Sequence, residues 1–173
     1  RFNNPKMDEM YPIVSLGEGA EIIAEEMQIS REDQDSYSLE SHTRAIAAIN
    51  DGKFEDEIIP ISVPQRRGDP VIVDTDEHPR YEKTDGAYEL AIDTESLGKL
   101  RPAFKKDGSV TAGNSSGIND GAAALLLASR EKADALGLKP LLRWVGSASA
   151  GTEPGHFAYG PIPATEKLLF PAG

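Results

Sequence analysis

The residues best suited to chemistry lie in a polar turn that precedes an apolar run. The segment "VTAGNSSGINDG" at 110–121 is rich in Gly, Asn, Ser and Asp, and Ala and Leu make up residues 122–127. The glycines let another molecule approach the backbone closely, and Ser115, Ser116 and Asn119 add short donors and acceptors. Free N–H groups at such a turn can bind an amide carbonyl or an anion. The pattern predicts either a site for an extended polar ligand or a tight loop-to-strand connection with caps.

Several other chemistries are excluded by residue type. The chain has no cysteine, which removes disulfides, thiolate catalysis and Cys-ligated zinc. Its three histidines (His42, His78 and His156) are far apart and lack metal-ligand spacing, so we expect no metal site. The turn also lacks the spacing and the lysine of a phosphate-binding P-loop, and it has no dinucleotide-binding glycine fingerprint.

Charge and composition narrow the class further. A net charge of −11 disfavours a nucleic-acid binder. The basic clusters at 66–67 and 99–106 are either a solvated surface or a phosphate-facing patch. With 173 residues, 39% of them hydrophobic, the chain suits a soluble domain, and no apolar stretch approaches the ~20 residues of a membrane span. The N-terminus has neither a signal peptide nor an initiator Met, as expected of a chain that began earlier.

Two helices are expected in the first third of the chain. Apolar residues at helical spacing predict one over 17–27, with Glu18 and Glu21 placed to favour the positive end of its dipole. Ser30 and Asp33 have capping-box spacing and open a second helix, which Gly52 ends. His42 falls on or beside the packed face of that helix, where we expect a structural role.

The middle of the chain predicts short strands and loops. Residues 56–64 and 69–77 are expected to be two strands joined by the turn "QRRGD". Residues 78–93 have a weak pattern and are expected to form a long surface excursion. Residues 94–100 predict a short helix capped by Thr94.

The last third predicts a βαβ-like unit, and with it an α/β fold. We expect a buried strand over 122–129, a helix that Ser129 caps and Gly137 ends, and a second strand over 139–151. A final helix is expected to start at Pro163-Ala164 and to be cut short by Pro171.

Four segments resemble the thiolase family. The segment "VTAGNSSGINDGAAALLLAS" is similar to the part that closes the N-terminal half of thiolases. The segments "ISREDQDSYSLESHTRAIAAINDGKFEDEIIPI" and "SLGKLRPAFKKDGSVTAGN" resemble the family's loop domain and the run into the turn. The segment "GPIPATEKLL" resembles the first helix of the C-terminal half. The resemblance covers nearly the whole chain, in family order.

The resemblance implies an incomplete, layered α/β thiolase-like fold with an inserted α+β loop domain. Residues 1–109 would form most of the loop domain, 110–140 the last strand and helix of the N-terminal half, and 141–173 the beginning of the C-terminal half. The implied activity is reversible Claisen condensation and thiolysis of acyl-CoA thioesters, with coenzyme A as a substrate and no tightly bound cofactor. The resemblance also implies a cytoplasmic homo-oligomer, a dimer or tetramer, in fatty acid metabolism.

The catalytic residues of the family, a nucleophilic Cys, a His and a second Cys, match nothing in this chain. By resemblance they would lie before Arg1 and after Gly173, so we expect the chain to be inactive alone. What it would carry is contact with coenzyme A. The positions that match the family's coenzyme A contacts are Ser116, Ser115, Ala112, Leu16 and Met7 along the pantetheine tunnel, and Arg80 and Ser96 at the nucleotide end. Two alternatives stay open, namely a stand-alone coenzyme A-binding module without catalysis and a subunit-interaction module.

Overall fold

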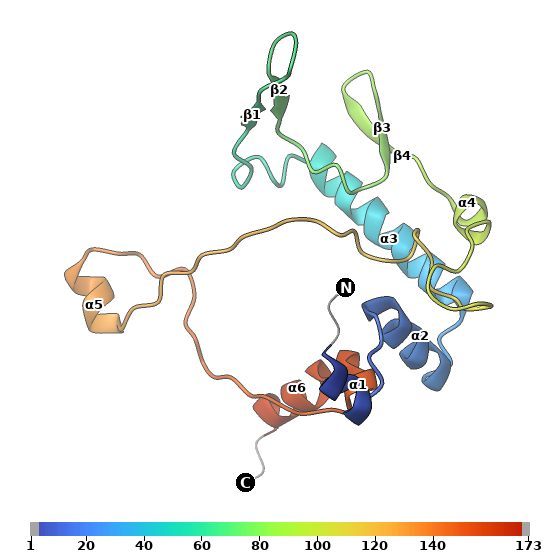
Figure 1. The fold of residues 1–173 in the computed structure, drawn as a ribbon. Coiled ribbons are helices and arrows are strands. Elements are labelled where there is room, and N and C mark those ends of the chain that lie inside the picture. Colours follow the sequence, from blue (N-terminus) through green and yellow to red (C-terminus); the bar gives the residue numbers. More distant parts are fainter. Residues whose placement is uncertain (1–3, 171–173) are drawn as a thin grey trace. The chain divides into compact units, whose positions relative to one another are not determined.

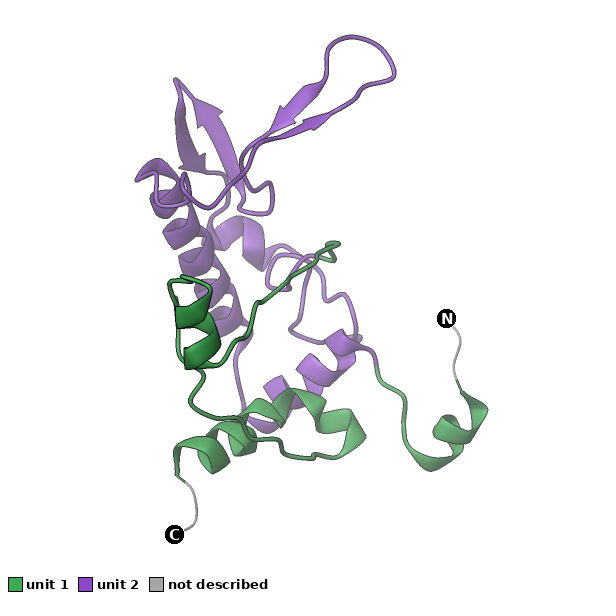
Figure 2. Cartoon of the chain, turned by 90° about the vertical axis from the view of Figure 1, so that its left-hand side faces the viewer, with its two compact units in different colours: residues 1–14, 118–173 green, residues 15–117 purple. Residues whose placement is uncertain are grey.

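Over its described residues the chain forms helices, two small antiparallel hairpins and long connecting loops. A computed structural model describes residues 4–170. It divides into two compact units, one made of Ser15–Gly117 and the other of Arg1–Val14 with Ile118–Gly173 (Figure 2). The mixture of helices and strands fits the α/β class. The inserted loop domain and its boundaries stay predictions.

The two expected helices of unit Ser15–Gly117 are confirmed. Helix α2 spans Leu16–Glu26 and begins at a capping box in which Ser15 and Glu18 satisfy each other's backbone N–H. Helix α3 spans Arg31–Asn50.

The ends of α3 are those that the sequence predicts. The Ser30 hydroxyl accepts the Asp33 N–H at 3.0 Å. At the other end, Gly52 takes the left-handed conformation with φ +68°, which glycine adopts without steric cost. Local capping residues therefore fix both ends of this helix.

Two hairpins follow α3. Strand β1 (Ile61–Val63) pairs antiparallel with β2 (Val71–Val73). A strand therefore lies within each expected range, 56–64 and 69–77, but each has only 3 residues. The second hairpin corrects an expectation, because residues 78–93 are not merely a surface excursion. Strand β3 (Tyr81–Thr84) pairs antiparallel with β4 (Ala87–Leu90).

The turn between β3 and β4 explains why the second hairpin forms. Its two central residues, Asp85 and Gly86, have φ of +51° and +87°, which is the backbone of a type I′ turn. Strand β4 of the hairpin is tied to α3, because the Asn50 side chain donates to the Tyr88 carbonyl at 2.8 Å and accepts the Tyr88 N–H at 2.9 Å. The weak hydrophobic pattern hid this strand pair, although the Asp-Gly turn is its signal.

Helix α3 is the organising element of this unit. It packs against β4 and against α4 (Thr94–Gly98) (Figure 1). The short helix α4 lies where it is expected, but its cap is Asp93 rather than Thr94. The Asp93 carboxylate accepts the Ser96 N–H at 2.7 Å, one residue earlier than the sequence prediction placed the cap.

The second unit carries helices α1 (Pro5–Met10), α5 (Arg130–Ala135) and α6 (Pro161–Leu169), with a 3-10 helix at Pro154–Tyr159 that packs against α6. The Ser129 cap of α5 is confirmed. Gly137 follows that helix with φ +64°, as a stop residue should. Helix α6 starts at Pro161, two residues before the expected start, and Pro171 lies outside the described residues.

The prediction of two strands in this unit is wrong. Residues 122–129 and 139–151 are extended loops without sheet pairing, so the βαβ-like unit does not form in residues 4–170. The physical reason is that a strand needs a hydrogen-bonded neighbour, and the only pairs among the described residues are β1–β2 and β3–β4. The leucines at 125, 126 and 127 are 90%, 82% and 81% exposed instead of buried.

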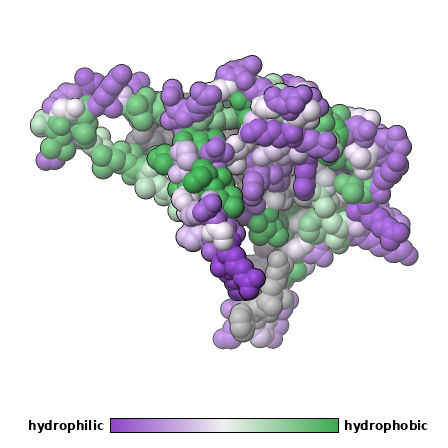
Figure 3. Space-filling view, turned by 90° about the horizontal axis from the view of Figure 1, so that it is seen from above, coloured by the Kyte–Doolittle hydropathy of each residue, from purple (hydrophilic) through white to green (hydrophobic). Residues whose placement is uncertain are grey.

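Apolar side chains are widely exposed, and the buried core is small. Apolar residues lie at the surface of the segment around α5 (residues 122–138), at the left of Figure 3. In unit Ser15–Gly117 the buried apolar residues come from α2, α3, α4 and the start of the polar turn. They are Ala24, Ile46, Leu97 and Val110. Of these, Leu97 lies against the turn that the sequence singles out, at Gly113.

Candidate functional site

The polar turn is folded by hydrogen bonds among its own residues. Thr111 is fully buried, and its hydroxyl accepts the Gly113 and Asn114 N–H groups at 3.1 and 3.3 Å. The Asn114 side chain accepts the Thr111 N–H at 2.7 Å, and the Ser115 hydroxyl donates to the Thr111 carbonyl at 2.6 Å. These local bonds define the loop, which confirms a turn at this position.

Helix α2 holds the segment that enters the turn. The Glu21 side chain is buried, with 4% of the residue exposed. Its carboxylate accepts the Ser109 N–H at 2.9 Å, the Val110 N–H at 2.9 Å and the Ser109 hydroxyl at 3.2 Å. Glu21 therefore replaces the backbone partners that a strand would offer to this segment. Its role differs from the expected one, since it binds the backbone of a distant segment rather than its own helix end.

Helix α3 holds the turn from a second direction. Asp35 is also buried, with 6% of the residue exposed. One carboxylate oxygen accepts from the Asn114 amide at 2.9 Å, and the other accepts from the Arg31 guanidinium at 2.7 Å. The same Asn114 amide donates to the Ser109 carbonyl at 3.0 Å. Asn114 thus joins the turn to α3 and to the segment that α2 holds.

Arg31 extends this network to α4. Its terminal nitrogen donates to the Leu97 carbonyl at 2.7 Å and to the Leu100 carbonyl at 3.1 Å. These carbonyls lie in the last turn of α4 and just after it, where a cation is favourable. The side chains of Leu97 and Leu100 also lie against Gly113, where an added Cβ would come within 2.6 and 2.4 Å of them. The turn and α4 are therefore linked by both polar and apolar contacts.

The structure leaves exposed the part of the turn that the sequence assigns to a ligand. Ala112 and Ser116 are exposed, and Ser115 is half-buried. The bonds to the helices come from Val110, which binds Glu21 on α2, and from the half-buried Asn114, which binds Asp35 on α3. The turn therefore presents small side chains to solvent, while its other side is bound by the buried carboxylates of Glu21 and Asp35.

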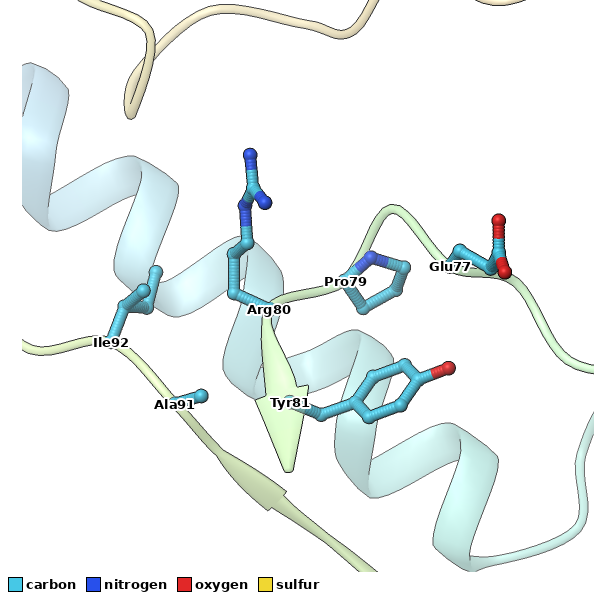
Figure 4. Close-up of a pocket in the computed structure, with 6 residues that line it drawn as sticks. All are labelled: Glu77, Pro79, Arg80, Tyr81, Ala91 and Ile92. Atoms are coloured by element: carbon cyan, nitrogen blue, oxygen red, sulfur yellow. The ribbon is translucent and has the colours of Figure 1, made fainter. Parts of the chain in front are cut away.

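Arg80 lies at a separate feature of the same unit. It lines an open pocket of about 300 Å³ with Glu77, Pro79, Tyr81, Ala91 and Ile92. Figure 4 shows the Arg80 side chain extending away from the Tyr81 ring. The described lining includes none of the other residues that the resemblance assigns to coenzyme A.

His42 fixes the backbone at Arg80. Its Nδ1 accepts the Arg80 N–H at 3.3 Å, and its ring centroid lies 5.9 Å from that of His78. Burial lowers the pKa of His42 below its ordinary value, and the nearby charges of His78 and Arg80 act in the same direction. The neutral ring is the form that can accept this hydrogen bond, so the geometry and the pKa agree. His42 has the structural role expected of it.

The remaining candidates have different surroundings. Leu16 begins α2 and is 78% exposed, so its side chain is available to a ligand. The Ser96 hydroxyl takes part in the cap of α4, because it accepts the Asp93 N–H at 3.0 Å and donates to the Asp93 carbonyl at 2.9 Å. Met7 is exposed and lies on α1, in the other compact unit. The structure therefore groups six of the seven candidates in unit Ser15–Gly117.

The residues that sequence reasoning missed are the anchors Glu21, Asp35, Asn114 and Arg31. Glu21 had a signal, since it lies four residues after Gly17 and three before Ala24, on the face of α2 that is buried. Asp35 had a weaker one, its spacing of four residues from Arg31. Nothing local indicates which distant segment these groups bind.

Neither a metal nor a membrane feature is found in the part of the chain that the structure describes. Within residues 4–170, no three His, Asp or Glu side chains gather as metal ligands. No helix in that range combines the length and apolar character needed to cross a membrane.

Comparison with known proteins gives a consistent result. The family model described as "Thiolase, N-terminal domain" matches residues 4–131. An acetyl-CoA acetyltransferase of Chromobacterium violaceum is 50% identical over 170 residues, which are 98% of this chain and 41% of that protein. A beta-ketoadipyl-CoA thiolase of Acinetobacter baylyi is 46% identical over 169 residues, 98% of this chain and 40% of that protein.

A solved structure agrees with these matches. The crystal structure of the Bacillus anthracis acetyl-CoA acetyltransferase matches with a TM-score of 0.78 and 47% identity, covering 91% of this chain and 38% of that one. The chain thus spans about 40% of the length of the curated relatives that it matches.

Proposed function

The chain belongs to the thiolase family, and we propose that it supplies part of the coenzyme A-binding wall of an enzyme that transfers acyl groups between coenzyme A thioesters. The reaction would be the reversible Claisen condensation and thiolysis that the resemblance implies. The observation that carries the proposal is the family match across the turn, together with the exposure of Ala112 and Ser116 on a turn anchored from behind.

The chemistry of the turn suits the pantetheine arm of coenzyme A. Pantetheine has two amides on an apolar stem, and it needs a few hydrogen-bonding groups among small apolar ones. Ser116 offers an exposed hydroxyl, and Ala112 an exposed methyl group. Leu16 is an exposed apolar side chain that would add to the lining. Met7 is exposed in the other compact unit, and its proposed contact with coenzyme A rests on the resemblance alone. Ser115 already donates to the Thr111 carbonyl, so we propose that it shapes the wall and contacts the ligand through its remaining lone pairs.

The nucleotide end of coenzyme A carries phosphates, and Arg80 is the cation proposed to meet it. A guanidinium binds phosphate oxygens through charge-assisted hydrogen bonds. Arg80 lies at the edge of an open pocket, and His42 holds its backbone. Ser96 is proposed to lie near the same end.

Helix α3 sets the spacing between these two parts of the wall. It holds the turn through Asp35 and the backbone of Arg80 through His42. These two residues are seven positions apart, so they lie on the same face of the helix, about 10 Å apart along its axis. One rigid helix would therefore hold the contacts for both ends of an elongated ligand.

Catalysis is proposed to belong to groups that this chain does not carry. The chain has no cysteine, so it cannot form the thioester intermediate with a Cys nucleophile. We propose that residues 1–173 are inactive alone and that the complete enzyme is a cytoplasmic homo-oligomer.

Calorimetry with coenzyme A tests the proposal. The complete thiolase that the proposal implies should bind coenzyme A, and Ser116→Trp should abolish binding because the indole would fill the space of the pantetheine arm. Ser36→Trp, at an exposed position on α3, is the matched control and should leave affinity unchanged. Equal affinities of the two variants would remove the turn from the site. The 173-residue chain, assayed alone, should show no thiolysis of a 3-oxoacyl-CoA thioester.

A further inference from the structure

The buried network around Asp35 has no assigned role, and its connections point to one. Asp35 and Arg31 form a pair four residues apart on α3, with the side chains 8% and 22% exposed. A buried carboxylate that lacks partners costs several kcal/mol, so each of its contacts matters. Asp35 receives one bond from α3 itself, through Arg31, and one from the turn, through Asn114.

Each of the two residues that bind Asp35 also binds a different part of the proposed wall. Arg31 continues to the Leu97 and Leu100 carbonyls at the end of α4, the helix that carries Ser96. Asn114 lies two residues before Ser116 and also holds the Thr111 N–H and the Ser109 carbonyl. The network is therefore continuous from the end of α4, through α3, to the turn.

We propose that Asp35, Arg31 and Asn114 are positioning residues, which hold the turn against α4 in the one arrangement that binds coenzyme A. This proposal rests on the proposed function of the turn. None of the three needs to touch the coenzyme. They act by keeping the binding-competent conformation populated, because apparent affinity falls in proportion to the fraction of molecules that have this conformation.

A neighbouring pair on the same helix shows what is special about this network. Glu40 and Arg44 are also four residues apart on α3 and 2.6 Å apart, but their side chains are 55% and 78% exposed. An exposed pair of this kind contributes little to stability. Glu40→Gln is therefore the matched control for Asp35→Asn, with the same helix, the same spacing and the same loss of one charge.

The test is coenzyme A affinity and steady-state kinetics in the complete thiolase. In Asp35→Asn an NH2 group replaces one of the two carboxylate oxygens. This NH2 group would face the donor of either Arg31 or Asn114, so one of the two bonds is lost and the turn should loosen. We expect Kd and KM for coenzyme A to rise about tenfold, with kcat nearly unchanged, since saturating coenzyme restores the bound arrangement. Kd for pantetheine should rise by the same factor, because the loss is at the turn. Glu40→Gln should change none of these.

A second variant guards against simple misfolding. Asn114→Ala leaves the Arg31–Asp35 pair intact. It removes the bond to Asp35 and also the bonds that the Asn114 side chain makes to Thr111 and Ser109. It should raise Kd for coenzyme A as Asp35→Asn does, with a circular dichroism spectrum like that of the parent. Coenzyme affinity unchanged in Asn114→Ala, while Ser116→Trp abolishes binding, would overturn the positioning role and leave the proposed function standing. Binding that survives Ser116→Trp would instead overturn the proposed site. A fall in kcat without a rise in KM would also overturn the positioning role.

Discussion

Removing the Glu21 carboxylate should loosen the segment that enters the turn. In Glu21→Ala the Ser109 and Val110 N–H groups lose their acceptor, and the Val110 amide lies in a buried position. Hydrogen bonds to a charged group contribute about 1.5–3 kcal/mol each, and two backbone donors are involved. Because such losses do not add fully, we expect a decrease of about 3–5 kcal/mol in the free energy of unfolding.

This loss is large against the total stability of a domain, about 5–15 kcal/mol. Glu21→Gln should cost less, about 1–3 kcal/mol, since the amide oxygen keeps one donor while its N–H faces the other. Glu25→Ala is the control, because Glu25 lies on the same helix and its side chain is 71% exposed. That substitution should leave the denaturation midpoint nearly unchanged.

Two measurements are needed for Glu21. Urea denaturation followed by circular dichroism gives the change in global stability. Amide hydrogen exchange at Ser109 and Val110 reports the local change, and a loss of about 3 kcal/mol should speed exchange there about 100-fold. If Glu21→Ala behaves like Glu25→Ala in both measurements, the carboxylate does not hold this segment.

Three further predictions follow from other contacts. Gly113→Ala should push the turn away from α4, because the new Cβ would lie 2.4 Å from a Leu100 methyl carbon. Calorimetry should therefore show weaker coenzyme A binding than in the control Gly121→Ala, where the added Cβ meets no atom within 4 Å. Because the pKa of His42 is lowered, the folded state binds fewer protons than the unfolded state between that lowered pKa and about pH 6.5. The free energy of unfolding should therefore fall as the pH falls through this window. In His42→Gln, urea denaturation at a series of pH values should show a smaller change of this free energy with pH. The exposed leucines at 125–127 should make the isolated chain associate at high concentration, and a monodisperse monomer by light scattering would contradict this.

Local signals in the sequence predicted the helices of unit Ser15–Gly117 well. Ser30 and Gly52 mark the two ends of α3 because caps act through neighbouring residues. The same kind of signal was present in Asp85-Gly86, and the strands that it joins were missed because their side chains are mostly polar and exposed.

Features that depend on distant partners were beyond local reasoning. Residues 122–129 were expected to be a buried strand, but no segment in residues 4–170 pairs with them. Periodicity describes a face of an element and not the neighbour that covers it. Ser116 and Arg80 could be proposed from the resemblance to thiolases, whereas the support of the turn by Glu21 and Asp35 became visible only in three dimensions.

The most direct test of the central claim is a crystal structure of the complete thiolase with coenzyme A bound. We predict that the pantetheine arm lies along residues 112–116, with the Ser116 hydroxyl about 3 Å from a pantetheine amide. A well-defined coenzyme with no atom in contact with these residues would contradict the claim.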